Sequence, residues 1–182
     1  GRNLKKIGLK SQDTSELFFD NVKVPQTHLL GTEEGQGFYQ LMKQLPWERL
    51  YIGITALGSM DCALEETTRY VQQRKAFGQR VMDFQNTRFK LAEIKTKIEV
   101  TRSFINDAIT RLETGTLDAA TASMAKWWAS QVQCDIIDEC LQLHGGYGYM
   151  EEYEISRAWR DTRLITIGGG TSEIMREILS RI

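Results

Sequence analysis

Proline is the residue that most restricts what this chain can fold into, because its two copies lie so close to one end. They are Pro25 and Pro46, so the stretch from Trp47 to Ile182 contains none. A proline inside a helix removes a backbone hydrogen bond and clashes with the preceding turn. The proline-free stretch can therefore form long helices, and Pro46 itself suits the first turn of the helix that follows it.

An apolar stripe supports a long helix between residues 91 and 112. Its members are spaced alternately three and four residues apart, as on one face of an α-helix. They are Leu91, Ile94, Ile98, Thr101, Ile105, Ala108 and Leu112. Gly115 suits the end of this helix, and Thr116 with Asp118 suits the start of the next. That next helix is crowded with alanine and serine, which lets neighbouring backbones approach closely.

The pattern as a whole predicts a mainly α protein. We expect five or six helices, the longer ones in an antiparallel bundle with short loops, with Thr171 or Ser172 capping the last. Residues 16–25 are rich in β-formers and stop at a proline, so they predict a strand. We therefore divide the chain into residues 1–30, the tail of a β-rich unit, and residues 31–182, a helical-bundle domain.

Composition argues against several classes of function. The net charge of −1 offers no electrostatic basis for binding nucleic acid or an acidic membrane. Three cysteines without CxxC spacing and two distant histidines indicate neither a disulfide framework nor a metal site. No apolar run approaches the ~20 residues that cross a bilayer, and no signal peptide opens the chain. We expect a soluble protein of a reducing compartment.

Glu48 has two possible roles. A glutamate in the first turn of a helix commonly complements the helix dipole from the surface. Its neighbours Trp47, Leu50, Tyr51 and Ile52 instead indicate burial, and a buried carboxylate needs a reason. An apolar pocket raises the pKa of a carboxyl group, whereas a helix N-terminus lowers it. The first effect suits a base that takes a weakly acidic proton.

The run Gly168–Gly170 is also open to two interpretations. Backbone amides that begin a helix suit anions, but a flexible connector capped by Thr171 has the same sequence. Neither a Walker loop nor a dinucleotide fingerprint surrounds the run. A basic turn formed by Arg74, Lys75 and Arg80 is similarly either a solvated corner or a pyrophosphate contact.

Two other features favour structural roles. His144 lies in a Gly-Gly segment that ends a helix, where a lone histidine is most often a cap or a hydrogen bonder of the core. Trp127 and Trp128 lie among alanines in mid-helix, which favours the core or a subunit interface over a stacking platform.

Four motifs, taken in order, resemble the C-terminal half of an acyl-CoA dehydrogenase. They are Pro46–Leu50, Gln73–Gln79, Gln142–Gly148 and Ile167–Ile174. The resemblance covers essentially the whole chain, from Lys6 to Ile182. Residues 122–129 and 141–146 look most like the long-chain branch. The first thirty residues resemble the end of the family's middle β-domain.

The resemblance implies an FAD-dependent oxidoreductase of fatty acid β-oxidation. In such enzymes a glutamate removes the α-proton of an acyl-CoA, and the β-hydrogen leaves as hydride to the flavin. The product is a trans-2-enoyl-CoA, and electrons pass to an electron-transfer flavoprotein. Gly169 stands where most members carry this glutamate, and glycine cannot act as a base. Glu48 matches the base of long-chain and isovaleryl members and is the predicted catalytic residue.

Other roles follow from the same resemblance. Arg49, Gly168 and Gly169 are the predicted substrate-binding residues beside the base. The predicted FAD contacts are Arg74, Phe77, Gln85, Gln142, Gly145, Gly146, Thr171 and Glu173. The loop of Gln142, Gly145 and Gly146 resembles one that reaches the FAD of a neighbouring subunit, which implies a dimer or a dimer of dimers. Two residues depart from the family, since Gly168 replaces a common aromatic residue and Glu173 replaces the glutamine of some members.

The family also implies the location and the state of the chain. A bacterial cytoplasm or a mitochondrial matrix is expected. Because the family places one face of the flavin and much of the acyl pocket in other parts of the protein, we expect these residues alone to be inactive.

Two alternatives stay open. One is an oxidase of the same fold, in which oxygen reoxidises the flavin. The other is a non-catalytic helical assembly module. Glu48 argues against the module, since a base that compensates for Gly169 is pointless in an inactive protein.

Overall fold

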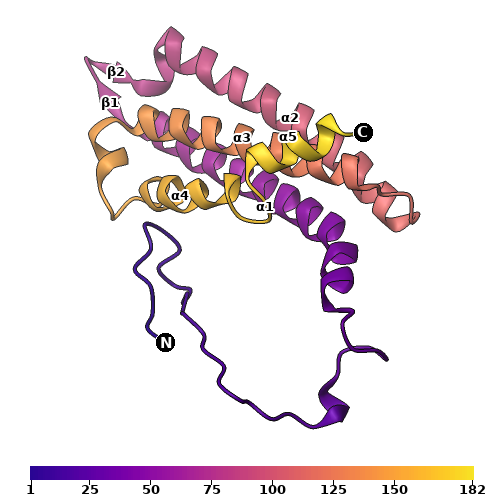
Figure 1. The fold of residues 1–182 in the computed structure, drawn as a ribbon. Coiled ribbons are helices and arrows are strands. Elements are labelled where there is room, and N and C mark those ends of the chain that lie inside the picture. Colours follow the sequence, from indigo (N-terminus) through magenta and orange to yellow (C-terminus); the bar gives the residue numbers. More distant parts are fainter.

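A computed structural model describes residues 1–182 and contains five α-helices (Figure 1). The three long helices are α1 (Gly37–Gln73), α2 (Gln85–Glu113) and α3 (Ala119–His144), and the short ones are α4 (Glu154–Thr162) and α5 (Ser172–Ser180). A hairpin of β1 (Lys75–Ala76) and β2 (Gln79–Arg80) joins α1 to α2. Short 3-10 helices are η1 (Gln26–His28), η2 (Val81–Asp83), η3 (Gly145–Tyr149) and η4 (Arg163–Thr166). Each long helix runs opposite to the one before it, so the predicted antiparallel bundle is confirmed.

The predicted stripe of α2 faces the core. Ile94, Ile98, Thr101, Ile105 and Ala108 are buried, and Leu91 and Leu112 at its two ends are half-buried. The stripe shares one apolar cluster with residues of α1, α3 and α4. Each large apolar side chain removed from water in this way contributes about 1.5–3 kcal/mol.

Small residues set the distance between α1 and α3. Ala122, Ala125 and Ala129 of α3 are fully buried, and α1 packs chiefly against this helix. Gly53 of α1 lies at the crossing. A Cβ atom on Gly53 would lie 2.8 Å from Cδ1 of Ile105 and 3.3 Å from the carbonyl oxygen of Ala125. The close approach of the two backbones therefore depends on a residue without a side chain.

We expect Gly53→Val to lower the free energy of unfolding by about 1–3 kcal/mol, because the added methyl groups overpack this crossing. Gly58 is the matched control, since it lies on the same helix and a Cβ atom there would meet nothing within 4 Å. Gly58→Val should change stability by less than about 0.5 kcal/mol. Urea denaturation of both variants measures the difference, and equal midpoints would show that the crossing is not tight.

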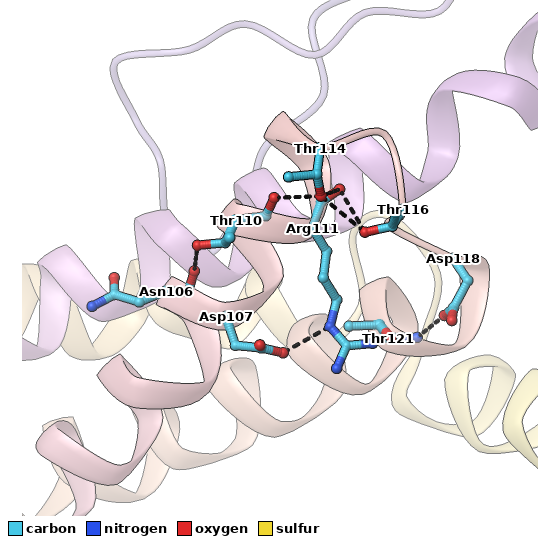
Figure 2. Close-up of polar contacts among 8 residues, drawn as sticks. All are labelled: Asn106, Asp107, Thr110, Arg111, Thr114, Thr116, Asp118 and Thr121. Carbon is cyan, nitrogen blue, oxygen red and sulfur yellow. Dashed lines mark hydrogen bonds and ion pairs between the residues drawn. The ribbon is translucent and has the colours of Figure 1, made fainter.

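The turn between α2 and α3 follows the predicted signals (Figure 2). Gly115 has a φ of +71°, the left-handed region that ends many helices. Asp118 caps α3, because its carboxylate accepts a 2.6 Å hydrogen bond from the backbone N–H of Thr121. Thr116 instead closes α2 by donating its backbone N–H to the carbonyl of Arg111. The boundary between these helices is therefore encoded locally.

The prediction for Pro46 is wrong. Helix α1 begins at Gly37, so Pro46 lies inside it and not in its first turn. The residues before Pro46 include good helix formers, such as Leu41, Met42 and Lys43, which extend the helix backwards. These turns are largely exposed and project beyond the bundle, so a distortion at the proline disrupts little packing.

The predicted strand over residues 16–25 is also wrong. Residues 1–36 form a mostly irregular arm (Figure 1) that contacts the bundle at α4, where Asp161 accepts a 2.6 Å hydrogen bond from the backbone N–H of Leu9. Its one β-bridge joins Asn3 to Ser15. A strand needs a neighbouring strand to pair its backbone groups, and none lies beside residues 16–25. The domain boundary at residue 30 stays a prediction. None of the helices is long and apolar enough to span a membrane.

Candidate active site

The predicted site residues form two groups that lie far apart along α1. The first group joins Glu48 and Arg49 of α1 to the glycine turn 168–170 and the start of α5. The second joins Arg74 at the end of α1 to the Gly145-Gly146 segment after α3. Positions 48 and 74 are 26 residues apart, which corresponds to about 39 Å along a helix that rises 1.5 Å per residue. The two groups therefore form separate surfaces.

The glycine turn has a backbone that only glycine adopts easily. Gly169 and Gly170 have φ angles of +67° and +107°. Thr171 then caps α5, as predicted, because its hydroxyl accepts a 3.3 Å hydrogen bond from the N–H of Ile174. The free amides at the start of α5 consequently lie directly beside the turn.

One contact ties this turn to α1. A Cβ atom built on Gly169 would collide with Cδ1 of Ile52. Ile52 follows Glu48 by one helical turn, and side chains four residues apart in a helix are neighbours, with Cβ atoms about 5–6 Å apart. Glu48 therefore lies on the same side of α1 as the residue that packs against Gly169.

Glu48 itself is exposed, so the structure favours the surface position over the buried one of its two interpretations. The buried residues of α1 next to Glu48 are Arg49, Leu50 and Gly53, and this places Glu48 at the edge of the buried face. Its carboxylate forms no hydrogen bond or ion pair within the chain. The carboxylate is thus accessible and unpaired, one helical turn from the contact between Ile52 and Gly169.

Arg49 points into the protein. Its side chain is buried, and Nη1 donates a 3.2 Å hydrogen bond to Oγ of Ser123 on α3. Nε is buried without a partner. Burial lowers the pKa of the guanidinium, while the neighbouring charge of Glu48 opposes that shift. Arg49 thus places a positive charge next to the predicted base.

Lys126 is a residue of this site that the sequence analysis missed. It is fully buried, and its Nζ donates a 2.5 Å hydrogen bond to the carbonyl oxygen of Gly170. A signal was present in the sequence. Ala122, Ala125, Lys126 and Ala129 share one face of α3 at helical spacing, so a lysine occupies a position of the small-residue stripe.

The second group surrounds a pocket of about 630 Å³. Its lining includes Tyr70, Arg74, Gln142, His144, Gly145, Gly146 and Tyr147. The guanidinium of Arg74 lies 5.1 Å from the centre of the Tyr147 ring. A Cβ atom on Gly145 or Gly146 would meet nothing within 4 Å, so the backbone of this segment is open to a ligand.

Phe77 and Gln85 do not line this pocket. Phe77 forms the tight turn between β1 and β2 together with Gly78, with φ angles of +51° and +82°. A positive φ is rare for a bulky side chain. The Phe77 ring is 97% exposed at the tip of the hairpin, and Gln85 is exposed at the start of α2. Both side chains are exposed on the surface of the chain, outside the pocket.

His144 is buried in the wall of the pocket, as expected of a histidine of the core. Its Nδ1–H donates a 2.9 Å hydrogen bond to the carbonyl of Cys140, and its ring stacks on Tyr70 with centroids 4.2 Å apart. Nε2 is buried without a partner. Burial lowers the pKa of the imidazole, and the hydrogen bond to Cys140 opposes that shift.

This lowered pKa predicts sensitivity to acid. The unfolded chain protonates His144 near its ordinary pKa of about 6.5, whereas the folded chain does so only at lower pH. Stability should therefore fall as the pH drops from about 7 to 5, where the unfolded state binds more protons. Urea midpoints across this range should depend less on pH in His144→Phe, which keeps the ring on Tyr70. His28→Phe, which replaces the exposed second histidine, is the matched control.

Comparison with known proteins identifies the family. Residues 35–182 match the model of the acyl-CoA dehydrogenase C-terminal domain. The chain belongs to the acyl-CoA dehydrogenase family. The predicted family is thereby confirmed, and with it the helical bundle as that of an acyl-CoA dehydrogenase C-terminal domain.

Individual members of the family match along the whole chain. The mitochondrial long-chain specific acyl-CoA dehydrogenase of Sus scrofa is 53% identical over 181 residues, which are 100% of this chain and 42% of that protein. A crystal structure of acyl-CoA dehydrogenase from Geobacillus kaustophilus superposes with a TM-score of 0.95 at 48% identity. It is matched over 100% of this chain and 47% of its own length. The caffeyl-CoA reductase-Etf complex subunit CarC of Acetobacterium woodii is 37% identical over 99% of this chain and 47% of that protein. The chain thus spans less than half of the relatives it matches.

Proposed function

We propose that this chain is the helical part of an FAD-dependent acyl-CoA dehydrogenase in which Glu48 is the base. The carboxylate of Glu48 takes the α-proton of the acyl-CoA, the β-hydrogen leaves with its electron pair, and a trans-2-enoyl-CoA forms. The observation that carries the proposal is the position of Glu48. It is accessible and unpaired, one helical turn from the contact between Ile52 and Gly169.

The residues of the chain fit FAD. The guanidinium of Arg74 and the open backbone at Gly145 and Gly146 suit a diphosphate, and the unpartnered Nε2 of His144 leaves a polar atom in the pocket wall. Thr171 and Glu173 would contact the cofactor from the start of α5. When bound, FAD supplies the two-electron acceptor of the dehydrogenation.

The spacing of the two groups supports shared cofactor sites. One FAD is too short to contact groups about 39 Å apart along α1. In the proposal each subunit holds one FAD near Glu48, and its Arg74, Phe77, Gln85 and Gln142 contact the FAD of a neighbour. The exposed Phe77 and Gln85 are then covered in the assembly, which is a dimer or a dimer of dimers.

The relatives support the choice of substrate and partner. The Sus scrofa protein is named long-chain specific, so we assign a long-chain acyl-CoA as substrate. The Acetobacterium woodii protein is named as a subunit of a complex with Etf, which supports an electron-transfer flavoprotein as acceptor. A mitochondrial matrix or a bacterial cytoplasm is the corresponding location.

Stopped-flow spectroscopy of the full-length holoenzyme tests this function. Acyl-CoAs of increasing length are mixed anaerobically with the enzyme, and flavin bleaching is followed. The reduced enzyme is then mixed with an electron-transfer flavoprotein or with oxygen. We expect long-chain substrates to bleach the flavin and the flavoprotein to reoxidise it faster than oxygen. Faster reoxidation by oxygen would identify an oxidase, and no bleaching with any acyl-CoA would support the assembly module.

A further inference from the structure

Lys126 is an unusual residue to find in the middle of this bundle. It is the largest of the fully buried side chains, with 0% of its surface exposed. An ammonium removed from water costs several kcal/mol unless it is paired and hydrogen-bonded. Lys126 takes part in none of the ion pairs of the chain. A methionine would fill the same space without this cost, so packing alone does not explain the charge.

The neighbouring cation adds to the cost of burying the Lys126 ammonium. Burial lowers the pKa of its ammonium, and the nearby guanidinium of Arg49 lowers it further. The carboxylate of Glu173 opposes these effects from an exposed position. Two buried cations, Arg49 and Lys126, therefore lie near each other without a buried carboxylate between them.

The ammonium donates a single hydrogen bond, and the acceptor shows where it acts. Lys126 Nζ donates to the carbonyl oxygen of Gly170, and this is the one side-chain hydrogen bond that any of the three glycines receives. The turn otherwise depends on backbone bonds such as that from the N–H of Gly168 to the carbonyl of Leu164. Glycine has more backbone freedom than any other residue, so a turn of three glycines gains much mobility when such an anchor is lost.

We propose that Lys126 is a positioning residue of the active site: its buried ammonium holds the Gly168–Gly170 turn against α3 and thereby sets where the turn lies relative to Glu48. The contact between Gly169 and Ile52 links the position of the turn to α1. The inference rests on the proposed function, because the benefit of a fixed turn is the placement of the thioester beside the base.

Lys126→Met in the full-length holoenzyme tests the proposal, because methionine keeps the length of the side chain and loses the charge and the donor. Steady-state kinetics should show a kcat lowered about 10–100-fold, the effect of a misplaced reacting group, with KM changed less than about threefold. Hydrogen–deuterium exchange should become faster in residues 168–173 and stay unchanged in the distant hairpin, residues 75–80. Lys95→Met, at an exposed lysine of α2, is the matched control and should leave kcat, KM and the exchange of residues 168–173 unchanged.

The two measurements separate this inference from the proposed function. Exchange in the turn reports the anchor whether or not the protein oxidises an acyl-CoA, whereas a wild-type holoenzyme without dehydrogenase activity would refute the proposed function alone. A variant with a wild-type kcat and unchanged exchange would overturn the role of Lys126. Should Lys126→Met fail to fold, Lys126→Gln, a shorter neutral donor, is measured with the same criteria.

Discussion

The Glu48→Gln enzyme is expected to bind FAD and acyl-CoA but to lose nearly all turnover. Glutamine has the shape of glutamate but cannot accept the α-proton, and general base catalysis typically contributes about 10²–10⁴-fold. Exchange of the α-proton of a bound acyl-CoA with deuterated water measures this step directly. It should be lost together with turnover, while the flavin content stays at the wild-type level.

Glu173 provides the control for this experiment, because it is the other carboxylate beside the glycine turn. It lies at the second position of α5, and the backbone and Thr171 at this helix N-terminus lower the pKa of its carboxyl group. A carboxylate stabilised in this way is a weak base. Glu173→Gln should therefore keep α-proton exchange, although it can weaken FAD binding. If instead Glu173→Gln abolished exchange and Glu48→Gln retained it, the assignment of the base would be reversed.

Moving the base to position 169 should restore activity only in part, and the structure indicates why. In Glu48→Gly with Gly169→Glu, the new glutamate must adopt the φ of +67°, which costs a residue with a side chain about 1–2 kcal/mol. Its Cβ atom also collides with Cδ1 of Ile52. We expect the double variant to exceed the activity of Glu48→Gly alone but to remain far below wild type, with an altered preference for acyl chain length.

A third substitution tests the structural reason for this limit. Ile52→Val removes the Cδ1 methyl group that occupies the required space, and a substitution of this kind costs only about 0.5–1.5 kcal/mol of stability. Added to the double variant, it should raise kcat further, whereas Ile52→Val in the wild-type background should not. Equal rates with and without Ile52→Val would show that Ile52 does not oppose a side chain at position 169.

Features encoded within a few residues could be predicted from the sequence. The stripe on α2, the end of that helix at Gly115 and the caps Asp118 and Thr171 all depend on neighbours within one or two turns. The strand over residues 16–25 failed because strand pairing needs a distant partner, which a local pattern does not specify. Pro46 failed because the helix continues before it through exposed turns, where an interior proline disrupts little packing.

The candidate site likewise contains residues that could be predicted from the sequence and features that could not. The glycine turn, Arg74 and the Gly145-Gly146 segment lie in short sequence motifs, so they could be singled out from the sequence alone. The exposure of Glu48 depends on which face of α1 packs against α3, and the role of Lys126 depends on a contact across 44 residues of sequence. A lysine among alanines could have been singled out from helical periodicity, but its partner at Gly170 is visible only in the fold.

The length of α1 has a genetic consequence if the flavin is shared as proposed. A chain damaged at Glu48 and a chain damaged at Arg74 carry lesions about 39 Å apart along one helix. When the two are co-expressed and assemble together, some interfaces combine an intact base from one copy with an intact guanidinium from the other. Two alleles that are each inactive alone would then complement one another, and the pattern of complementation would map which lesions belong to which of the two groups.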